Sequence, residues 1–134
     1  MSQGQAALNA TTTCLRLKPD GMADKLPVGP DFWPDLIAGK LGDFHHEYLV
    51  TTFSFDQNWS SWEIHPNGDE VVFLLGGAVD FILDTAEGEQ IIEVRWPGDY
   101  ALVPKGTWHT ANPLQPSMML LITAGEGTRN KPRA

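Results

Sequence analysis

Cysteine is nearly absent from this sequence: Cys14 is the only one among 134 residues. A lone cysteine can form neither a disulfide within the chain nor a thiolate cluster for zinc, so we expect a reducing, cytoplasmic location. No stretch approaches the roughly eighteen consecutive apolar residues of a membrane-spanning helix. The first residues also lack the positive start and apolar core of a secretory signal. We therefore expect no membrane partner and no export.

Basic residues are also scarce, because 9 Lys and Arg stand against 17 Asp and Glu, a formal net charge of −8. A surface of this sign repels phosphate backbones, so we expect no nucleic-acid partner. Turn-forming residues, in contrast, are plentiful, with 13 Gly and 10 Pro. That content favours β structure over a helical bundle, and the length suits a single domain over residues 1–134.

Short β-rich segments dominate the chain from residue 48 onward and are separated by Gly, Pro, Asn or Asp. We expect an all-β protein, an antiparallel jelly-roll sandwich or barrel that hides its strand edges. A short helical turn is expected over 31–39, a loose N-terminal arm over 1–13, and a frayed tail over 125–134. The expected strands are 14–18, 48–55, 62–66, 70–75, 79–84, 90–94, 100–103 and 117–123.

The stretch 59–70 carries the strongest chemical signal. Side chains alternate along a strand, so Glu63 and His65 point to the same face. The sequence Pro-Asn-Gly-Asp at 66–69 indicates a tight turn, after which the strand that begins at Glu70 folds back beside the first. An imidazole and two carboxylates are therefore predicted to lie close together.

A second stretch, 97–112, reads as turn, strand, turn and then His109 at the start of another extended segment. This arrangement can deliver one more imidazole across a rolled sheet, although spacing alone does not establish the meeting. The predicted polar pocket is lined by His65, Glu70 and His109.

Together the two stretches resemble the paired motifs of the cupin superfamily. The first motif, G-x5-H-x-H-x(3,4)-E-x6-G, is matched by His65, Glu70 and Gly77. The second, G-x5-P-x-G-x2-H-x3-N, is matched by four residues, with Asn112 one place early. These four are Gly98, Pro104, Gly106 and His109. The resemblance implies the cupin double-stranded β-helix, a jelly-roll barrel that spans most of the chain.

The sequence departs from the first motif at two positions. Glu63 stands where cupins usually have the first histidine, and Gln57 stands where the glycine is expected. The resemblance implies a divalent metal (Fe, Mn, Ni or Zn) held by His65, Glu70 and His109. Glu63 is then either a fourth ligand, which favours harder cations over copper, or a catalytic general base.

Several functions are compatible with this pattern. The leading hypothesis is a small metal-binding cupin that binds a small organic molecule, with a dioxygenase or isomerase reaction. The alternative is a non-catalytic binding or sensing module, with or without metal. Without metal, Glu63, Glu70, His65 and His109 titrate as a coupled set. Family analogy predicts a homodimer. We interpret His45 and His46 as surface residues and Cys14 as a buried apolar residue.

Overall fold

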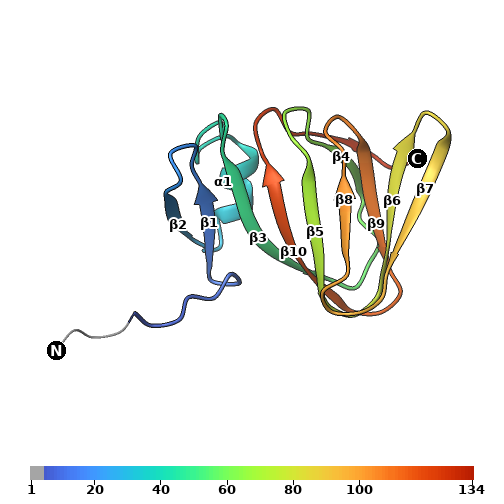
Figure 1. Cartoon of the computed structure of the whole chain (residues 1–134), viewed down its shortest axis with the longest axis horizontal. Coiled ribbons are helices and arrows are strands. Elements are labelled where there is room, and N and C mark those ends of the chain that lie inside the picture. The colour runs from blue at the N-terminus through green and yellow to red at the C-terminus, as the bar shows by residue number, and fades with distance from the viewer. Residues whose placement is uncertain (1–4) are drawn as a thin grey trace.

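The computed structural model describes residues 5–134, so the first four residues of the predicted arm lie outside the described part. Residues 5–134 form two antiparallel sheets (Figure 1). The six-stranded sheet has the order β2 (Ala23–Pro27), β1 (Thr13–Leu17), β3 (Tyr48–Phe55), β10 (Ser117–Ala124), β5 (Glu70–Gly76) and β8 (Tyr100–Val103). The five-stranded sheet has the order β11 (Arg129–Pro132), β4 (Ser61–Ile64), β9 (Trp108–Pro113), β6 (Val79–Thr85) and β7 (Gly88–Val94).

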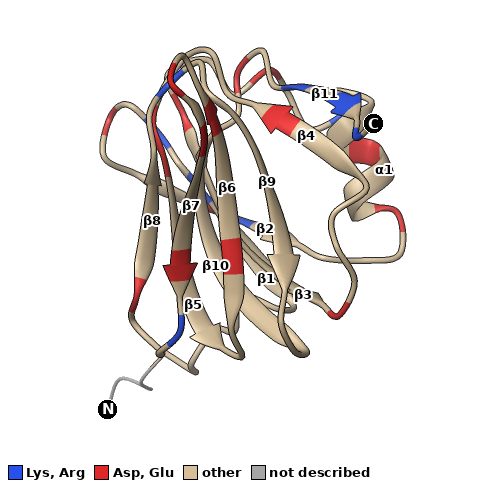
Figure 2. Cartoon of the chain, turned by 90° about the vertical axis from the view of Figure 1, so that its right-hand side faces the viewer, with Lys and Arg blue, Asp and Glu red and all other residues tan. Residues whose placement is uncertain are grey.

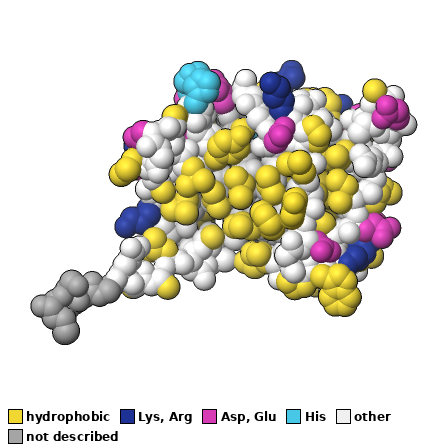
Figure 3. Space-filling model, in the orientation of Figure 1, with side chains coloured by type: hydrophobic (Ala, Val, Ile, Leu, Met, Phe, Trp, Pro, Cys, Tyr) yellow, Lys and Arg dark blue, Asp and Glu magenta, His cyan; other side chains and the backbone are white. Residues whose placement is uncertain are grey.

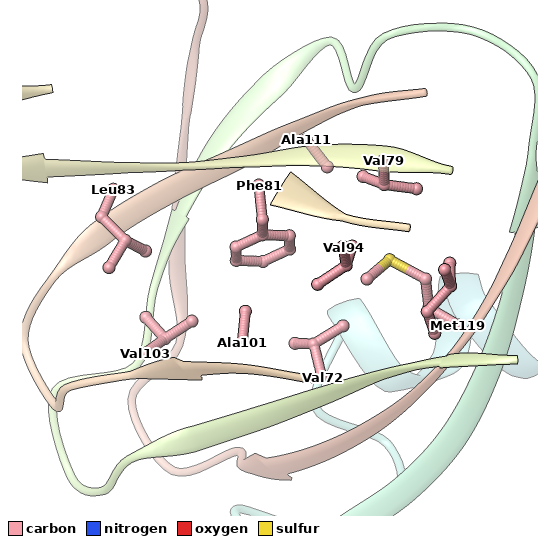
Figure 4. Close-up of a cluster of buried hydrophobic side chains, with 10 residues drawn as sticks. Val72, Val79, Phe81, Leu83, Val94, Ala101, Val103, Ala111 and Met119 are labelled. Atoms are coloured by element: carbon pink, nitrogen blue, oxygen red, sulfur yellow. The ribbon is translucent and has the colours of Figure 1, made fainter. Parts of the chain in front are cut away.

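The two sheets face each other across the main hydrophobic core (Figure 4). Val72 on β5 and Met119 on β10 point inward from one sheet, and Val79 and Phe81 on β6 point inward from the other. All four are fully buried. Alternation along the strands produces this arrangement, because every second residue faces the core. The predicted antiparallel all-β architecture is confirmed. Within residues 5–134 the strands pair as two separate hydrogen-bonded sheets, so strand pairing does not close them into one barrel.

A second, smaller core lies at the β1 and β3 end of the six-stranded sheet. It consists of Cys14, Phe32, Phe44 and Leu49, each at most 5% exposed. Phe32 comes from α1 (Phe32–Ile37), which lies within the segment where a helical turn was expected. The burial of Cys14 agrees with its interpretation as an apolar residue. Among the described residues, no helix is long and apolar enough to span a membrane.

The chain ends differ from expectation. Thr13 already belongs to β1, so only residues 5–12 of the described arm lie outside strands. The prediction of a frayed tail is wrong for Arg129–Pro132, which pair with β4 as β11. Figure 2 shows β11, with its Lys and Arg in blue, at the edge of the five-stranded sheet. Their side chains are all exposed, so backbone pairing and not apolar burial fixes the strand.

Candidate metal centre

Four side chains that could ligate a metal meet between the two sheets. Glu63 lies on β4, His65 follows that strand, Glu70 begins β5 and His109 lies on β9. One ligand atom from each can be chosen so that all four lie within 4.8 Å of one another. The side chains of His65, Glu70 and His109 are at most 2% exposed, whereas that of Glu63 is 28% exposed. The cluster is therefore buried and reaches solvent on the Glu63 side.

Strand alternation and pairing register bring these groups together. Glu63 and His65 are two residues apart and share a face, and Glu63 Oε1 lies 3.1 Å from His65 Nε2. Glu63 is also the direct cross-strand partner of His109. Glu70 Oε2 lies 3.1 Å from His65 Nε2, and Glu70 Oε1 lies 3.0 Å from His109 Nε2. Glu70 is thus the carboxylate that joins the two imidazoles.

The turn before β9 is tied directly to the turn after β4. The Gly106 N–H donates to the His65 carbonyl at 3.0 Å, and the Lys105 N–H donates to Asp69 Oδ1 at 2.8 Å. Gly106 has φ +74°, a left-handed conformation that glycine adopts at little cost. These bonds hold the His65 backbone against the segment that leads to His109.

Each histidine has its Nδ1 atom engaged outside the cluster. His109 Nδ1 lies 3.0 Å from the Thr107 carbonyl, which can only accept, so Nδ1 carries a proton. His65 Nδ1 lies 2.8 Å from Thr128 Oγ1. With Nδ1 protonated, a neutral imidazole presents the lone pair of Nε2, which is the form that binds metals.

Three polar atoms at the centre are buried without a hydrogen bond: His65 Nε2, Glu70 Oε1 and His109 Nε2. The other carboxylate oxygen, Glu70 Oε2, accepts from the Thr123 hydroxyl at 2.7 Å. Burying unpaired polar groups is costly, and two acceptors 3.0 Å apart repel unless a proton or a cation lies between them. Two imidazoles and two carboxylates are a donor set that suits a divalent cation. The residues present therefore fit the metal that the sequence pattern implied.

The electrostatics of the metal-free protein follow from the same contacts. Burial disfavours a charged His65, but the adjacent carboxylates of Glu63 and Glu70 outweigh it and raise the pKa of His65 to about 9. Burial also disfavours a charged Glu70, yet His109 and His65 hold the pKa of Glu70 down at about 2. Without metal at neutral pH, a charged His65 thus lies between two carboxylates.

The structure brings all four predicted site residues together. Asn112, matched to the second motif, lies elsewhere and accepts from Arg133 Nη1 at 2.7 Å. His45 is exposed and contacts Glu126 Oε1 at 2.8 Å. Sequence reasoning missed Thr123 and Thr128, which contact Glu70 and His65. Alternation along β10 could have placed Thr123 on the inner face, whereas no sequence signal indicated Thr128.

No family model matches the sequence. Solved structures with a similar fold include an oxalate oxidase (TM-score 0.52, 15% identity, 60% of this chain and 44% of that chain). They also include the oxalate decarboxylase of Bacillus subtilis (TM-score 0.51, 14% identity, 63% of this chain and 23% of that chain). A cupin-2 domain protein from Shewanella frigidimarina matches with TM-score 0.48 and 20% identity over 64% of this chain and 71% of that chain.

The likenesses to the oxalate oxidase and the oxalate decarboxylase show that the chain shares the fold of these cupins, and the four-residue cluster is consistent with the resemblance. The chain spans less than half the length of either oxalate enzyme. Identities of this size show the fold alone.

Proposed function

We propose that this chain binds one divalent metal ion through His65, Glu70 and His109, with Glu63 as the fourth ligand or as a general base. The observation that carries the proposal is the convergence of three buried polar atoms, His65 Nε2, Glu70 Oε1 and His109 Nε2, that have no hydrogen-bond partner outside the cluster. Two imidazole nitrogens there face the two oxygens of one carboxylate, His65 Nε2 against Glu70 Oε2 and His109 Nε2 against Glu70 Oε1, with both Nδ1 atoms already engaged. A cation bound by the two Nε2 atoms and by Glu70 would satisfy all three.

The donor set narrows the choice of metal. Two carboxylates and two imidazoles suit iron(II), manganese, nickel or zinc better than copper(I), which prefers sulfur ligands. Bacillus subtilis oxalate decarboxylase, a protein of similar fold, has Mn(II) centres. We further propose that the two sheets together form the double-stranded β-helix barrel of cupins and that the protein is cytoplasmic.

In the leading form of the proposal, the chain is an enzyme that acts on a small, oxygen-rich organic molecule as a dioxygenase or isomerase. The metal would polarise a substrate oxygen or activate dioxygen. Glu63 is the group that could move a proton, because its side chain is both near His65 and open to solvent. His65 and His109 would hold their positions through the bonds at Nδ1.

A specific observation also favours the alternative, a non-catalytic binding or sensing module. Phe81 stacks on the His109 ring, with centroids 5.6 Å apart and an interplanar angle of 23°. Phe81 and Leu83 are almost fully buried on the same strand. If all coordination positions are filled by protein, the metal is structural, because a catalytic metal keeps one position open.

Metal analysis tests the proposal. Protein purified without chelators, or reloaded after their removal, is expected to hold one equivalent of manganese or iron by mass spectrometry. Water-proton relaxation of the Mn(II) form then separates the two roles: fast exchange of bound water indicates an open position and favours the enzyme. Relaxation equal to that of fully enclosed Mn(II) favours the binding module with a structural metal. No retained metal under any loading condition contradicts the metal-binding proposal and leaves only the metal-free form of the binding module.

We also propose that the protein is a homodimer. Its two copies pair through the side of the six-stranded sheet that points away from the main core, here called the outer face. The outward side chains of β10 and β5 are all apolar, and those of β1, β3 and β8 carry no charge. Figure 3 shows a continuous apolar area there. The outer face includes Leu75, Tyr100 and Leu102, which are 44%, 57% and 51% exposed.

The size of the outer face supports pairing with a second copy. The five strands lie about 4.8 Å apart and are four to eight residues long, so they cover about 500 Å² in projection. Because side chains project from the sheet, the accessible area is larger than this projection. It approaches the roughly 800 Å² that each partner buries in a stable complex. A neutral, flat, apolar face can pair with its own copy about a two-fold axis without opposing like charges.

Sedimentation equilibrium checks the dimer. The wild-type protein is expected to show the mass of two chains, and Leu120→Glu, which places a charge on β10 in the middle of the outer face, is expected to show the mass of one chain. Ile91→Glu is the matched control, because Ile91 is 56% exposed on the other sheet, and this variant should stay dimeric. A wild-type mass equal to one chain contradicts the proposal.

A further inference from the structure

The C-terminal segment places one hydroxyl group, that of Thr128, against a histidine of the candidate metal centre. Thr128 precedes β11, and its Oγ1 atom lies 2.8 Å from His65 Nδ1. The same oxygen lies 2.9 Å from the Gly125 carbonyl within the turn that leads from β10 to β11. Thr128 therefore joins a buried histidine to a main-chain acceptor.

This pair of contacts fixes the direction of both hydrogen bonds. A carbonyl only accepts, so the Thr128 hydroxyl must donate its one proton to Gly125. The lone pairs of Oγ1 are then left for His65, and His65 Nδ1 must be the donor. When His65 is neutral, its proton is on Nδ1 and the lone pair on Nε2 points toward Glu70, into the cluster.

Without this acceptor, the opposite tautomer of His65 would be favoured. His65 Nε2 lies 3.1 Å from an oxygen of each of two carboxylates, Glu63 and Glu70. Both carboxylates attract a proton to Nε2, and a proton there occupies the lone pair that a metal requires. The contact with Thr128 opposes this preference from the other side of the ring.

We propose that Thr128 is a positioning residue that holds His65 in its metal-binding tautomer and orientation, and that the C-terminal segment 125–133 is thereby part of the metal centre. This inference rests on the proposed metal-binding function. The segment is well anchored for the role. Asn67 Nδ2 donates to the Glu126 carbonyl at 2.9 Å, and Arg133 Nη1 donates to the Trp59 carbonyl at 3.1 Å.

Three variants test the role of Thr128. Thr128→Val keeps the shape of the side chain but removes the oxygen that accepts from His65. Thr128→Ser retains that oxygen. Thr110→Val is the matched control, because the buried Thr110 hydroxyl also donates to a main-chain carbonyl, that of Ser61, at 3.0 Å. Thr110 alternates with His109 on β9 and faces away from the cluster.

Metal affinity is measured by competition with a chelator at fixed pH. We expect Thr128→Val to weaken manganese binding about 10- to 100-fold, the usual effect of removing a partner of a ligating histidine. Thr128→Ser should bind within about threefold of wild type, and Thr110→Val should do the same even if it is less stable. Equal losses in Thr128→Val and Thr110→Val, or no recovery with serine, would overturn the proposal.

A second measurement does not depend on metal. In metal-free protein labelled with ¹⁵N-histidine, the Nδ1–H signal of His65 should be visible in wild type and in Thr128→Ser, and lost to exchange in Thr128→Val. If wild type binds no metal but these signals behave as expected, the metal-binding function fails while the contact stands. If the signal is unchanged in Thr128→Val, the positioning role fails whatever the metal content.

Discussion

Replacing Glu70 by alanine is expected to abolish metal binding and to destabilise the metal-free protein by about 3–5 kcal/mol, the usual cost of removing one partner of a buried ion pair. Glu70 is 1% exposed, lies within 3.1 Å of both Nε2 atoms and holds the Thr123 hydroxyl. Its removal leaves the charged His65 with one carboxylate, Glu63, in place of two. Urea unfolding in the presence of a chelator measures the change in free energy, and mass spectrometry measures the metal.

Two further variants distinguish the loss of metal ligands from simple unfolding of the protein. Glu70→Gln keeps the volume of the side chain and an oxygen for Thr123 but loses the negative charge, so it should fold and still bind little metal. His109→Ala removes a ligand from a different sheet and should lose metal as well. Metal content equal to that of wild type in all three variants would show that this cluster is not the metal centre.

Metal affinity is expected to rise steeply with pH. In the metal-free protein the pKa of His65 is raised to about 9, so below that pH a proton occupies the ring and must leave when metal binds. Affinity should therefore increase about tenfold per pH unit from about pH 6 to pH 9 and level off above. The pKa of Glu70, about 2, keeps this carboxylate charged throughout the range.

Calorimetry in buffers of different ionisation enthalpy counts the proton directly: about one should be released per metal bound at pH 7. Glu63→Gln removes one of the two carboxylates beside His65, so the pH at which affinity levels off should move downward. Affinity that is independent of pH between 6 and 9 would mean that His65 is neutral before metal binds or is no ligand.

Local patterns in the sequence predicted much of this site. The two-residue spacing of Glu63 and His65 fixes a shared face, and the turn at 66–69 returns the chain so that Glu70 lies beside them. The position of His109 was harder to predict, because it depends on the pairing of β4 with β9 across a long stretch of sequence. The turns and strand of 97–112 allowed that meeting, and the motif resemblance implied it.

The C-terminal segment shows why the remainder could not be predicted. Hydrophobic periodicity reports buried faces, yet all four residues of β11 are exposed and held by backbone pairing. Their basic, polar sequence is typical of a solvated tail. β2 was missed for a similar reason, since none of its residues is buried. The Thr128 hydroxyl lies just before β11 in the C-terminal segment. Hydrophobic periodicity could not predict its contact with His65.

The aromatic packing beneath His109 limits what this centre could admit. Phe81 lies against that ring, and Trp59 meets Phe81 edge to face with centroids 5.8 Å apart. Of the four cluster residues only Glu63 has appreciable exposure, 28% against at most 2% for the others, so a small molecule bound at the proposed metal would reach it past this carboxylate.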